Sequence, residues 1–415
     1  MLMSLEKAFV FEKTITAPVE LIYRAFTSST ALREWLCDIA TTNPEEGGWI
    51  YLVWNRGYFA SGHFTRLIPE KAISFKWIGK DEPGWTDVDV TITPLDDEDL
   101  HNVRISHSGI GEGDEWAKSR EEISKGWALG LKNLKSTLEV GKDLRFVERP
   151  LIGIYPEDLS DLTKTALEEL NVPVNKGVKV KELVPGYGAD QAGIQKGDVI
   201  VAVNNQPIDG VRALLALMLE FAAGDEITVT AYRENTKKTF SIDTKPQKFE
   251  DIPETSEELA KELENFISKS LEALEGVLTD VTDAEASFSP GPDEWSAKET
   301  LVHLIHNERE LHTYINDVVA GQERFQDDWS GDQLFRIRAT LTTYPTVDDL
   351  MAEFRRSLKE TVASVAFLDQ SFARRKASYW RLGTEILNSI RHIQEHTRQI
   401  EDAIHEARSR IAAEA

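Results

Sequence analysis

The chain has 415 residues, and its 47 Lys and Arg against 71 Asp and Glu give a formal net charge of −24. A charge of this sign repels nucleic-acid phosphates and anionic membrane surfaces, so we expect neither as a partner. The single cysteine, Cys37, excludes an internal disulfide, no basic-then-apolar leader precedes Lys7, and no apolar run reaches the ~18 residues of a membrane span, so we expect a cytoplasmic protein.

Three domains are predicted, over residues 1–148, 149–248 and 249–415, since this length suggests about two to four. In the first domain, segments bounded by Gly, Pro and Asp clusters are predicted to be strands. They are residues 9–15, 49–54, 58–67, 72–78, 86–94 and 101–108. Pro18 opens a helix, where its missing N–H costs nothing, and a long amphipathic helix follows over residues 116–140. This pattern predicts an α+β domain.

Three motifs stand out in this domain. They are the run Thr16-Ala17-Pro18-Val19-Glu20-Leu21-Ile22-Tyr23-Arg24-Ala25-Phe26, the run Leu32-Arg33-Glu34-Trp35, and Gly126-Trp127 with the helix end Leu134-Lys135-Ser136-Thr137-Leu138-Glu139. Together they resemble the START-like (SRPBCC) family of heat-shock ATPase activator homologues. The resemblance implies a helix-grip fold, in which a curved antiparallel sheet wraps a C-terminal helix and leaves an apolar cavity in some members.

Seven of the ten tryptophans lie in this domain: Trp35, Trp49, Trp54, Trp77, Trp85, Trp116 and Trp127. Two interpretations stay open. The rings either form a packed aromatic core, which large aromatic side chains usually do, or line a cavity for an apolar small molecule or a segment of a client protein. His63, His101 and His107 lack the spacing of metal ligands and are expected to be core or surface residues.

The second domain is identified by the stretch from Tyr187 to Asn204. A short helix over residues 189–192 ends at Gly193, a turn at Lys196-Gly197-Asp198 follows, and an apolar strand ends at Asn204. This order resembles PDZ domains in the circular arrangement of HtrA-type proteases. The resemblance covers residues 151–244, but no protease motif accompanies it.

The PDZ resemblance implies a site for the C-terminal peptide of a partner protein, which would add to the domain as an extra strand. Backbone N–H groups of Leu151-Ile152-Gly153-Ile154 would hold the terminal carboxylate, and a helix over residues 211–222 would form the opposite wall. The expected peptide-binding residues are Leu151, Ile152, Gly153, Ile154, Val211, Leu214, Leu215 and Met218. No His opens the helix, so an apolar peptide is favoured.

The third domain repeats apolar residues at intervals of three and four, which predicts helices. Its apolar stripes cover residues 259–278, 301–311 and 350–365, and a fourth helix is predicted over residues 381–410. Ser296 and Glu299 form a capping box that starts the second helix. Four helices of this length predict a four-helix bundle.

His392 and His396 lie four residues apart, so they share one helix face and can meet one ion or form a polar surface pair. Glu294-Trp295-Ser296, Glu299-Thr300-Leu301-Val302-His303-Leu304 and the run from His392 to Ile400 resemble the DinB-like superfamily. That resemblance implies a three-histidine site of His303, His392 and His396 for a divalent Zn, Ni, Fe or Mn. His306, His312 and His405 are expected at the surface, with a place beside the site as the alternative for His306.

Two functions therefore fit the sequence. The first is a cytoplasmic multidomain binding and adaptor protein that captures an apolar ligand or client, a C-terminal peptide and a divalent metal. The alternative is a metal-dependent enzyme, in which the ion transfers groups to or from small thiols or activates water. No other catalytic motif is present, and Cys37 is expected to be a packed, inert thiol.

Overall fold

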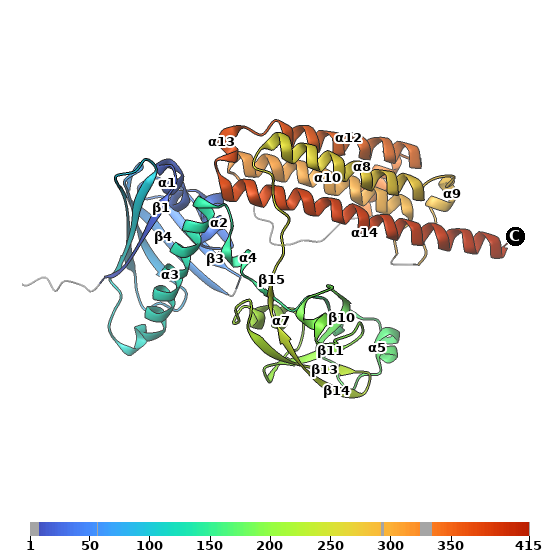
Figure 1. Cartoon of the computed structure of the whole chain (residues 1–415), viewed down its shortest axis with the longest axis horizontal. Helices are drawn as coiled ribbons and strands as arrows, with labels where there is room; N and C mark the ends of the chain where they lie inside the picture. Colours follow the sequence, from blue (N-terminus) through green and yellow to red (C-terminus); the bar gives the residue numbers. More distant parts are fainter. Residues whose placement is uncertain (1–7, 56, 292–293, 324–333, 415) are drawn as a thin grey trace, which may run out of the picture. The chain divides into compact units, whose positions relative to one another are not determined.

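The protein is described by a computed structural model that covers residues 8–55, 57–291, 294–323 and 334–414 (Figure 1). The chain divides into two compact units. One combines Met1–Lys142 with Glu250–Ala415, and the other is Asp143–Phe249. None of the described helices is long and apolar enough to cross a bilayer.

The N-terminal part is an α+β domain built on a seven-stranded antiparallel sheet, with strand order β1-β7-β6-β5-β4-β3-β2. The strands are β1 (Phe9–Thr16), β2 (Ile39–Thr42), β3 (Trp49–Trp54), β4 (Tyr58–Ile68), β5 (Ala72–Gly79), β6 (Thr86–Pro94) and β7 (Leu100–Ser108). Helices α1 (Val19–Thr27) and α2 (Ser29–Trp35) connect β1 to β2, and the long helix α3 (Ala117–Glu139) packs its buried face into the sheet's core. This is the helix-grip arrangement that the sequence predicted.

Most of the tryptophans form a packed core in this domain. Trp35, Trp77, Trp116 and Trp127 are buried, and Trp77 has its ring centroid 5.9 Å from that of Trp127 and 6.3 Å from that of Trp54. Trp49 and Trp85 instead point outward. The rings therefore pack against one another, as the core interpretation predicts.

His107 is fully buried among these rings and is held in one tautomer. The Trp127 indole can only donate, and its Nε1 lies 3.0 Å from His107 Nδ1, so Nδ1 accepts. Nε2 then carries the proton and donates to Thr86 Oγ1 at 2.8 Å. Burial lowers the pKa of His107 to about 4.

The second unit contains a six-stranded PDZ sheet with the order β14-β13-β11-β10-β9, and β12 also pairs with β11. Its strands are β8 (Pro150–Leu151), β9 (Ile154–Asp158), β10 (Val178–Leu183), β11 (Val199–Val203), β12 (Gln206–Pro207), β13 (Glu226–Arg233), β14 (Thr236–Asp243) and β15 (Lys245–Pro246). Its helices are α4 (Leu144–Val147), α5 (Lys164–Leu170), α6 (Gly188–Gln191) and α7 (Val211–Met218). β8 and β15, near the ends of the unit, pair with each other.

A bidentate ion pair fixes the turn that identifies this domain. Arg233 donates from Nε to Asp198 Oδ1 and from Nη2 to Asp198 Oδ2, both at 2.7 Å, and Asp198 is buried. Gly193 has the left-handed φ of 81° that its place after a helix requires. Helix α6 is one turn long and lies one residue before its predicted position, and α7 ends at Met218 rather than continuing to residue 222.

The C-terminal part is an all-helical bundle whose long helices are α8 (Ser256–Val277), α10 (Ala297–Ala320), α12 (Val347–Ala366) and α14 (Lys376–Glu414). Shorter helices are α9 (Asp283–Ala286), α11 (Leu334–Thr343) and α13 (Gln370–Ala373). The predicted capping box is present, since Ser296 Oγ accepts from Glu299 N and the Glu299 carboxylate accepts from Ser296 N at 2.8 Å. Helix α14 starts five residues before the predicted fourth helix.

We predict that His107 makes the stability of the N-terminal domain depend on pH. Between its folded pKa of about 4 and its ordinary pKa of 6.5, the unfolded chain binds the extra proton. The free energy of unfolding should therefore fall by about 2 kcal/mol from pH 7 to pH 5 through this residue and stay flat above pH 7. His107→Gln keeps a hydrogen-bond donor and an acceptor but does not titrate in this pH range. Its free energy of unfolding, measured in urea by tryptophan fluorescence, should therefore lack this fall between pH 7 and pH 5. Equal pH slopes in both proteins would contradict the prediction.

Candidate functional site

Three histidines from two helices of the bundle converge on one point. His303 comes from α10, and His392 and His396 come from α14. His392 Nε2 lies 3.1 Å from His303 Nε2 and 2.9 Å from His396 Nε2. One ligand atom from each ring lies within 4.8 Å of the others, and all three side chains are half-buried.

The helical repeat places these rings. The spacing of four residues brings His392 and His396 to one face of α14, with their ring centroids 4.3 Å apart. Ile393 and Ile400 are buried in the same stretch and orient this part of α14 toward the core. On α10, Leu301 and Leu304 are buried on either side of His303 and fix that helix against the same core.

The arrangement fits a divalent metal better than it fits hydrogen bonds among the rings. A neutral imidazole carries one N–H, so His392 Nε2 cannot donate to both neighbouring nitrogens at once. A tetrahedral ion bound at ~2.0–2.1 Å would hold its nitrogen ligands about 3.3 Å apart, close to the two separations found here. The cluster can therefore bind a metal ion through three Nε2 atoms.

The surroundings keep two of the rings, His392 and His396, in the form that binds a metal. His396 Nδ1 lies 2.7 Å from Gln399 Oε1, an acceptor, so Nδ1 carries the proton and Nε2 keeps its lone pair. Burial, with smaller contributions from His396 and His303, lowers the pKa of His392 to about 4. Burial also lowers the pKa of His396. Neutral imidazoles at neutral pH are what metal coordination requires.

The other bundle histidines differ in part from their predicted places. His405 is exposed, as expected. The surface prediction is wrong for His306, which is buried with its Nε2 3.0 Å from Thr340 Oγ1. His312 is partly buried, and its Nε2 lies 2.8 Å from Thr361 Oγ1. Helix α11, which supplies Thr340, was not predicted, and it covers this side of α10.

A buried carboxyl group in the bundle was also missed. Glu308 on α10 is 1% exposed and accepts a hydrogen bond of 2.7 Å from Thr361 Oγ1. Burial raises its pKa to about 7. The only sign of this burial in the sequence is that a charged residue stands in the apolar stripe between Ile305 and Leu311. A glutamate at the edge of an exposed helix face gives the same pattern.

The loop predicted to hold a peptide carboxylate has free donors. Gly153 takes a φ of 83°, and a Cβ built there would lie 2.0 Å from Tyr187 Cβ, so only glycine fits. The carbonyls of Ile152 and Gly153 accept from Ala189 N and Val184 N, both at 2.9 Å. Within the described part of the chain, the N–H groups of Ile152 and Gly153 donate no hydrogen bond. This leaves donors for an anionic oxygen.

Strand β9 follows this loop and is the edge of the sheet, beside α7. Val211 N donates to Asp158 Oδ1 at 2.7 Å and ties the start of α7 to the end of β9. The predicted peptide-binding residues of α7 divide between two faces. Leu214 and Met218 are buried in the domain core, whereas Val211 and Leu215 are at least partly exposed and share a face at a spacing of four.

Comparison with protein-family models confirms the three kinds of domain. The model for activator of Hsp90 ATPase homolog 1-like proteins (AHSA1) matches residues 16–139, the PDZ domain model matches residues 150–244, and the DinB superfamily model matches residues 266–400. The chain therefore combines an AHSA1 domain of the SRPBCC type, a PDZ domain with HtrA-like homologues and a DinB superfamily domain.

Curated relatives match one part of the chain each. A probable periplasmic serine protease of the do/HhoA-like type from Haemophilus influenzae is 34% identical over 102 residues, which are 24% of this chain and 20% of that protein. The human activator of 90 kDa heat shock protein ATPase homolog 1 is 31% identical over 134 residues, which are 32% of this chain and 37% of that protein. The chain thus spans well under two thirds of either relative.

Solved structures are likewise similar to single parts. The Aha1 dimer from Colwellia psychrerythraea is 26% identical, with a TM-score of 0.29, and the match covers 33% of this chain and 98% of that one. The HtrA3 PDZ domain bound to a phage-derived ligand is 28% identical, with a TM-score of 0.20, and the match covers 23% of this chain and 85% of that one.

We predict that the purified chain holds about one divalent ion, and that His396→Ala loses it. Removal of a direct ligand should weaken binding by more than the ~10–100-fold that loss of an outer partner costs. His405→Ala, which changes an exposed histidine on the same helix, is the matched control. Elemental analysis after dialysis measures both, and the Trp295 ring, 5.1 Å from that of His303, reports loading by fluorescence. Unchanged metal content in His396→Ala would show that the cluster is not a metal site.

Proposed function

We propose that the chain is a binding and adaptor protein, in which the PDZ domain captures the C-terminal peptide of a partner and the bundle carries a divalent metal. The observation that carries the proposal is the free edge of β9 beside a loop whose N–H groups at Ile152 and Gly153 have no partner among the described residues. A terminal carboxylate would accept from these donors. The peptide would then continue along β9 as an added strand.

Side chains beside β9 favour an apolar peptide. Val211 and Leu215 present aliphatic groups on one face of α7, and Leu215 is 40% exposed. The first turn of the helix holds no histidine or acidic side chain that would select a polar residue of the peptide. The proposed peptide contacts are therefore the loop from Leu151 to Ile154 with Val211 and Leu215, while Leu214 and Met218 hold α7 in place.

A proline in β9 limits the number of backbone hydrogen bonds that the strand can make to an added peptide. Val180 faces Pro156 in the ladder. Its N–H donates to Asp198 O and its C=O accepts from Gly197 N, both at 2.9 Å. The backbone of Pro156 therefore points away from β10, toward the open edge. Proline has no N–H, so a bound peptide would receive a hydrogen bond from Ile154 but none from Pro156.

The first prediction from this proposal concerns the terminal carboxylate. An apolar peptide with a free C-terminus should bind at least tenfold more tightly than the same peptide as an amide, because the amide removes the charge that the Ile152 and Gly153 N–H groups accept. Fluorescence anisotropy on the full chain measures both. Equal affinity for the free acid and the amide would show that the loop from Leu151 to Ile154 does not bind the terminal carboxylate.

The second prediction concerns the missing donor. Pro156→Val restores an N–H at the open edge and should tighten the free-acid peptide by roughly 3–10-fold, the effect of one added backbone hydrogen bond of about 0.5–1.5 kcal/mol. Pro207→Val in the two-residue strand β12 is a control away from β9. If Pro156→Val binds no more tightly than the control, the peptide does not add along β9.

The histidine cluster supports the competing proposal of an enzyme. Three histidines would leave a Zn, Ni, Fe or Mn ion with open positions, and such an ion supplies Lewis acidity toward water or a thiol. This chain's contribution would be to hold the three imidazoles of the cluster together and to orient His396 through its contact with Gln399. The chain's one cysteine is buried in the AHSA1 domain, so the bundle offers no thiol nucleophile of its own. Turnover of thiol conjugates that disappears in His396→Ala, with peptide capture intact, would favour the enzyme.

The AHSA1 domain supports client binding more than enclosure of a small molecule. Trp49, Tyr51, Phe59 and Trp85 are 41–55% exposed, and their neighbours Ile50 and Leu52 on β3 point to the core. Aromatic side chains gathered on one sheet face are typical of protein contact surfaces. With the cytoplasmic location expected from the sequence, these features make an adaptor the function that we favour.

A further inference from the structure

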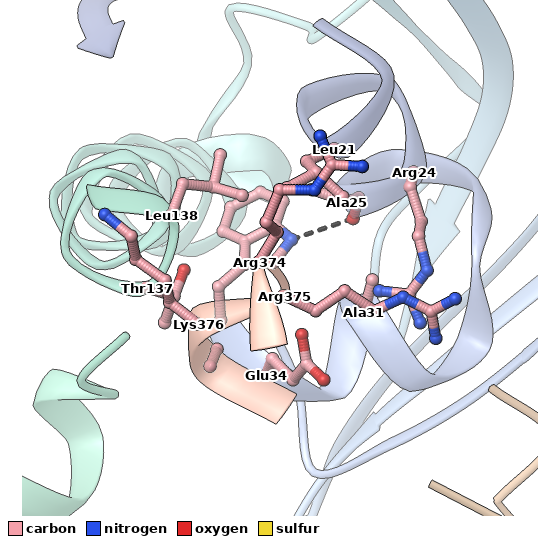
Figure 2. A pocket seen from close by; sticks show the side chains of 12 residues that line it. Leu21, Arg24, Ala25, Ala31, Glu34, Thr137, Leu138, Arg374, Arg375 and Lys376 are labelled. Atoms are coloured by element: carbon pink, nitrogen blue, oxygen red, sulfur yellow. Dashed lines mark hydrogen bonds between the residues drawn. The ribbon is translucent and has the colours of Figure 1, made fainter. Parts of the chain in front are cut away.

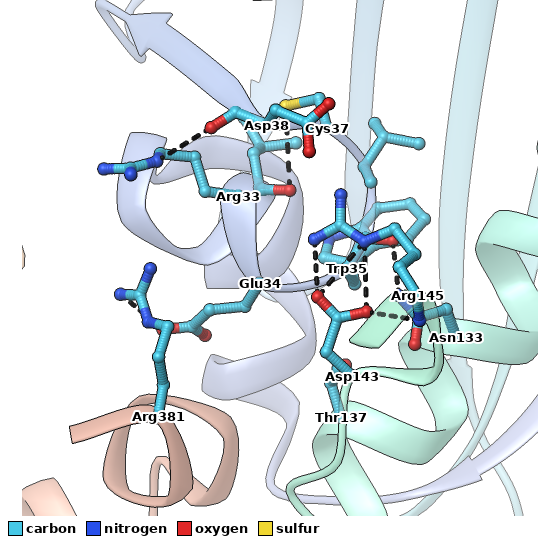
Figure 3. A network of polar contacts seen from close by, with 12 residues as sticks. Arg33, Glu34, Trp35, Cys37, Asp38, Asn133, Thr137, Asp143, Arg145 and Arg381 are labelled. Atoms are coloured by element: carbon cyan, nitrogen blue, oxygen red, sulfur yellow. Dashed lines mark hydrogen bonds and ion pairs between the residues drawn. The ribbon is translucent and has the colours of Figure 1, made fainter. Parts of the chain in front are cut away.

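The AHSA1 domain and the bundle belong to one compact unit, and a group of charged side chains lies where α1, α2 and α3 meet the start of α14. Ser378 Oγ donates to the Glu34 carboxylate, and Lys376 Nζ donates to Glu139 O at 2.6 Å. Figure 3 shows the Glu34 carboxylate turned toward Arg381.

The charges in this group do not cancel. Glu323 bridges Arg381, at 2.6 Å, and Arg33, at 3.2 Å, and its side chain is 7% exposed. Glu34 lies 3.9 Å from Arg381. Arg24 and Arg375 lie near Glu34 and Arg381, and Glu385 is a third carboxylate beside Arg381. Four arginines (Arg24, Arg33, Arg375 and Arg381) therefore outnumber the carboxylates of this group, which is costly where water is excluded.

The end of helix α10 takes up only part of this surplus. Its last carbonyls carry a partial negative charge, and Arg375 Nη1 donates to Val319 O at 3.0 Å. Arg24 reaches the same helix end, since a Cβ built at Gly321 would lie 3.3 Å from its Nη2. That Nη2 is buried and has no hydrogen-bond partner within the described residues. A buried guanidinium nitrogen without an acceptor costs free energy that a ligand oxygen would recover.

A recess opens beside Arg24. Arg24, Arg374, Arg375 and Lys376 line it together with Glu34 and the apolar Leu21 and Leu138 (Figure 2). Four cationic side chains thus share the recess with one carboxylate. Arg374 and Lys376 are exposed, so an ion can reach the recess from solvent. Lys376 and Arg375 each donate to a backbone carbonyl, whereas the side chains of Arg24 and Arg374 donate no hydrogen bond within the described residues.

We propose that this recess binds a phosphate group, either as inorganic phosphate or at the end of a small metabolite. Guanidinium groups match phosphate oxygens in geometry, and a phosphate carries about −1.5 to −2 charges at pH 7. It therefore offsets more of the positive charge of the four cationic side chains in the recess than a monocarboxylate does. The bound group would touch α1 from the AHSA1 domain and the link between α13 and α14 of the bundle, so its occupancy stabilises the contact between the two.

The test is isothermal titration of the full chain with sodium phosphate against sodium chloride at equal ionic strength. His396→Ala serves as the background, so that phosphate binding at the histidine cluster does not contribute. Phosphate should bind saturably, at least tenfold more weakly in Arg24→Gln and several-fold more weakly in Arg374→Gln. Arg338→Gln, an exposed arginine of α11 outside the recess, should bind as its parent does.

Arg374→Gln still tests the proposal if Arg24→Gln does not fold, since Arg374 is exposed. Phosphate binding no stronger than chloride binding would overturn the proposal. So would equal binding by the recess variants and Arg338→Gln. Equal affinity for acetate and phosphate would overturn the assignment to a doubly charged group. A phosphorylated sugar that binds more tightly than inorganic phosphate would support a metabolite as the source.

Discussion

The unbroken run of helix α14 from Lys376 to Glu414 is the constraint on which the larger unit depends. Eleven residues separate Arg381 from His392, which is close to three full turns, so both side chains leave nearly the same side of the helix about 16 Å apart. Helix α10 lies against it with His303 near its start and Glu323 just after its end. Two helices thus hold the histidine cluster at one place and the arginine group at another, and neither site can shift along its helix without moving the other.

Polar groups inside this unit are satisfied in different ways. The His107 ring has a partner at each nitrogen, Trp127 at one and Thr86 at the other, so it acts as a fixed part of the core. The Nε2 atoms of the three bundle histidines face one another instead, and no arrangement of their protons pairs all of them. Arg24 is a third case, a donor without an acceptor among the described residues. The physical difference between a structural and a ligand-binding polar group is whether the protein itself completes the hydrogen bonds.

Local patterns in the sequence predicted much of this structure. Segments bounded by Gly, Pro and Asp clusters predicted six of the seven strands described in the AHSA1 sheet, all but β2. The Ser296 and Glu299 capping box predicted the start of α10, and the spacing of His392 and His396 predicted two rings on one helix face. The misses share a cause. The burial of His306 depends on α11, and the pairing of Glu34 with Ser378 joins residues 344 apart in the chain. Such contacts follow from how elements pack, and no periodicity within a window of residues encodes them.

The pairing of β8 with β15 has a consequence for how the chain folds. The PDZ unit interrupts the larger unit between Lys142 and Glu250, so the AHSA1 domain and the bundle must meet across more than a hundred intervening residues. Because β8 and β15 hold the two ends of the insertion together, a folded PDZ unit acts as a short tether. Shortening the effective loop about eightfold lowers the entropy cost of closure by roughly 2 kcal/mol. An inserted domain that folds early therefore speeds the assembly of the discontinuous domain pair around it.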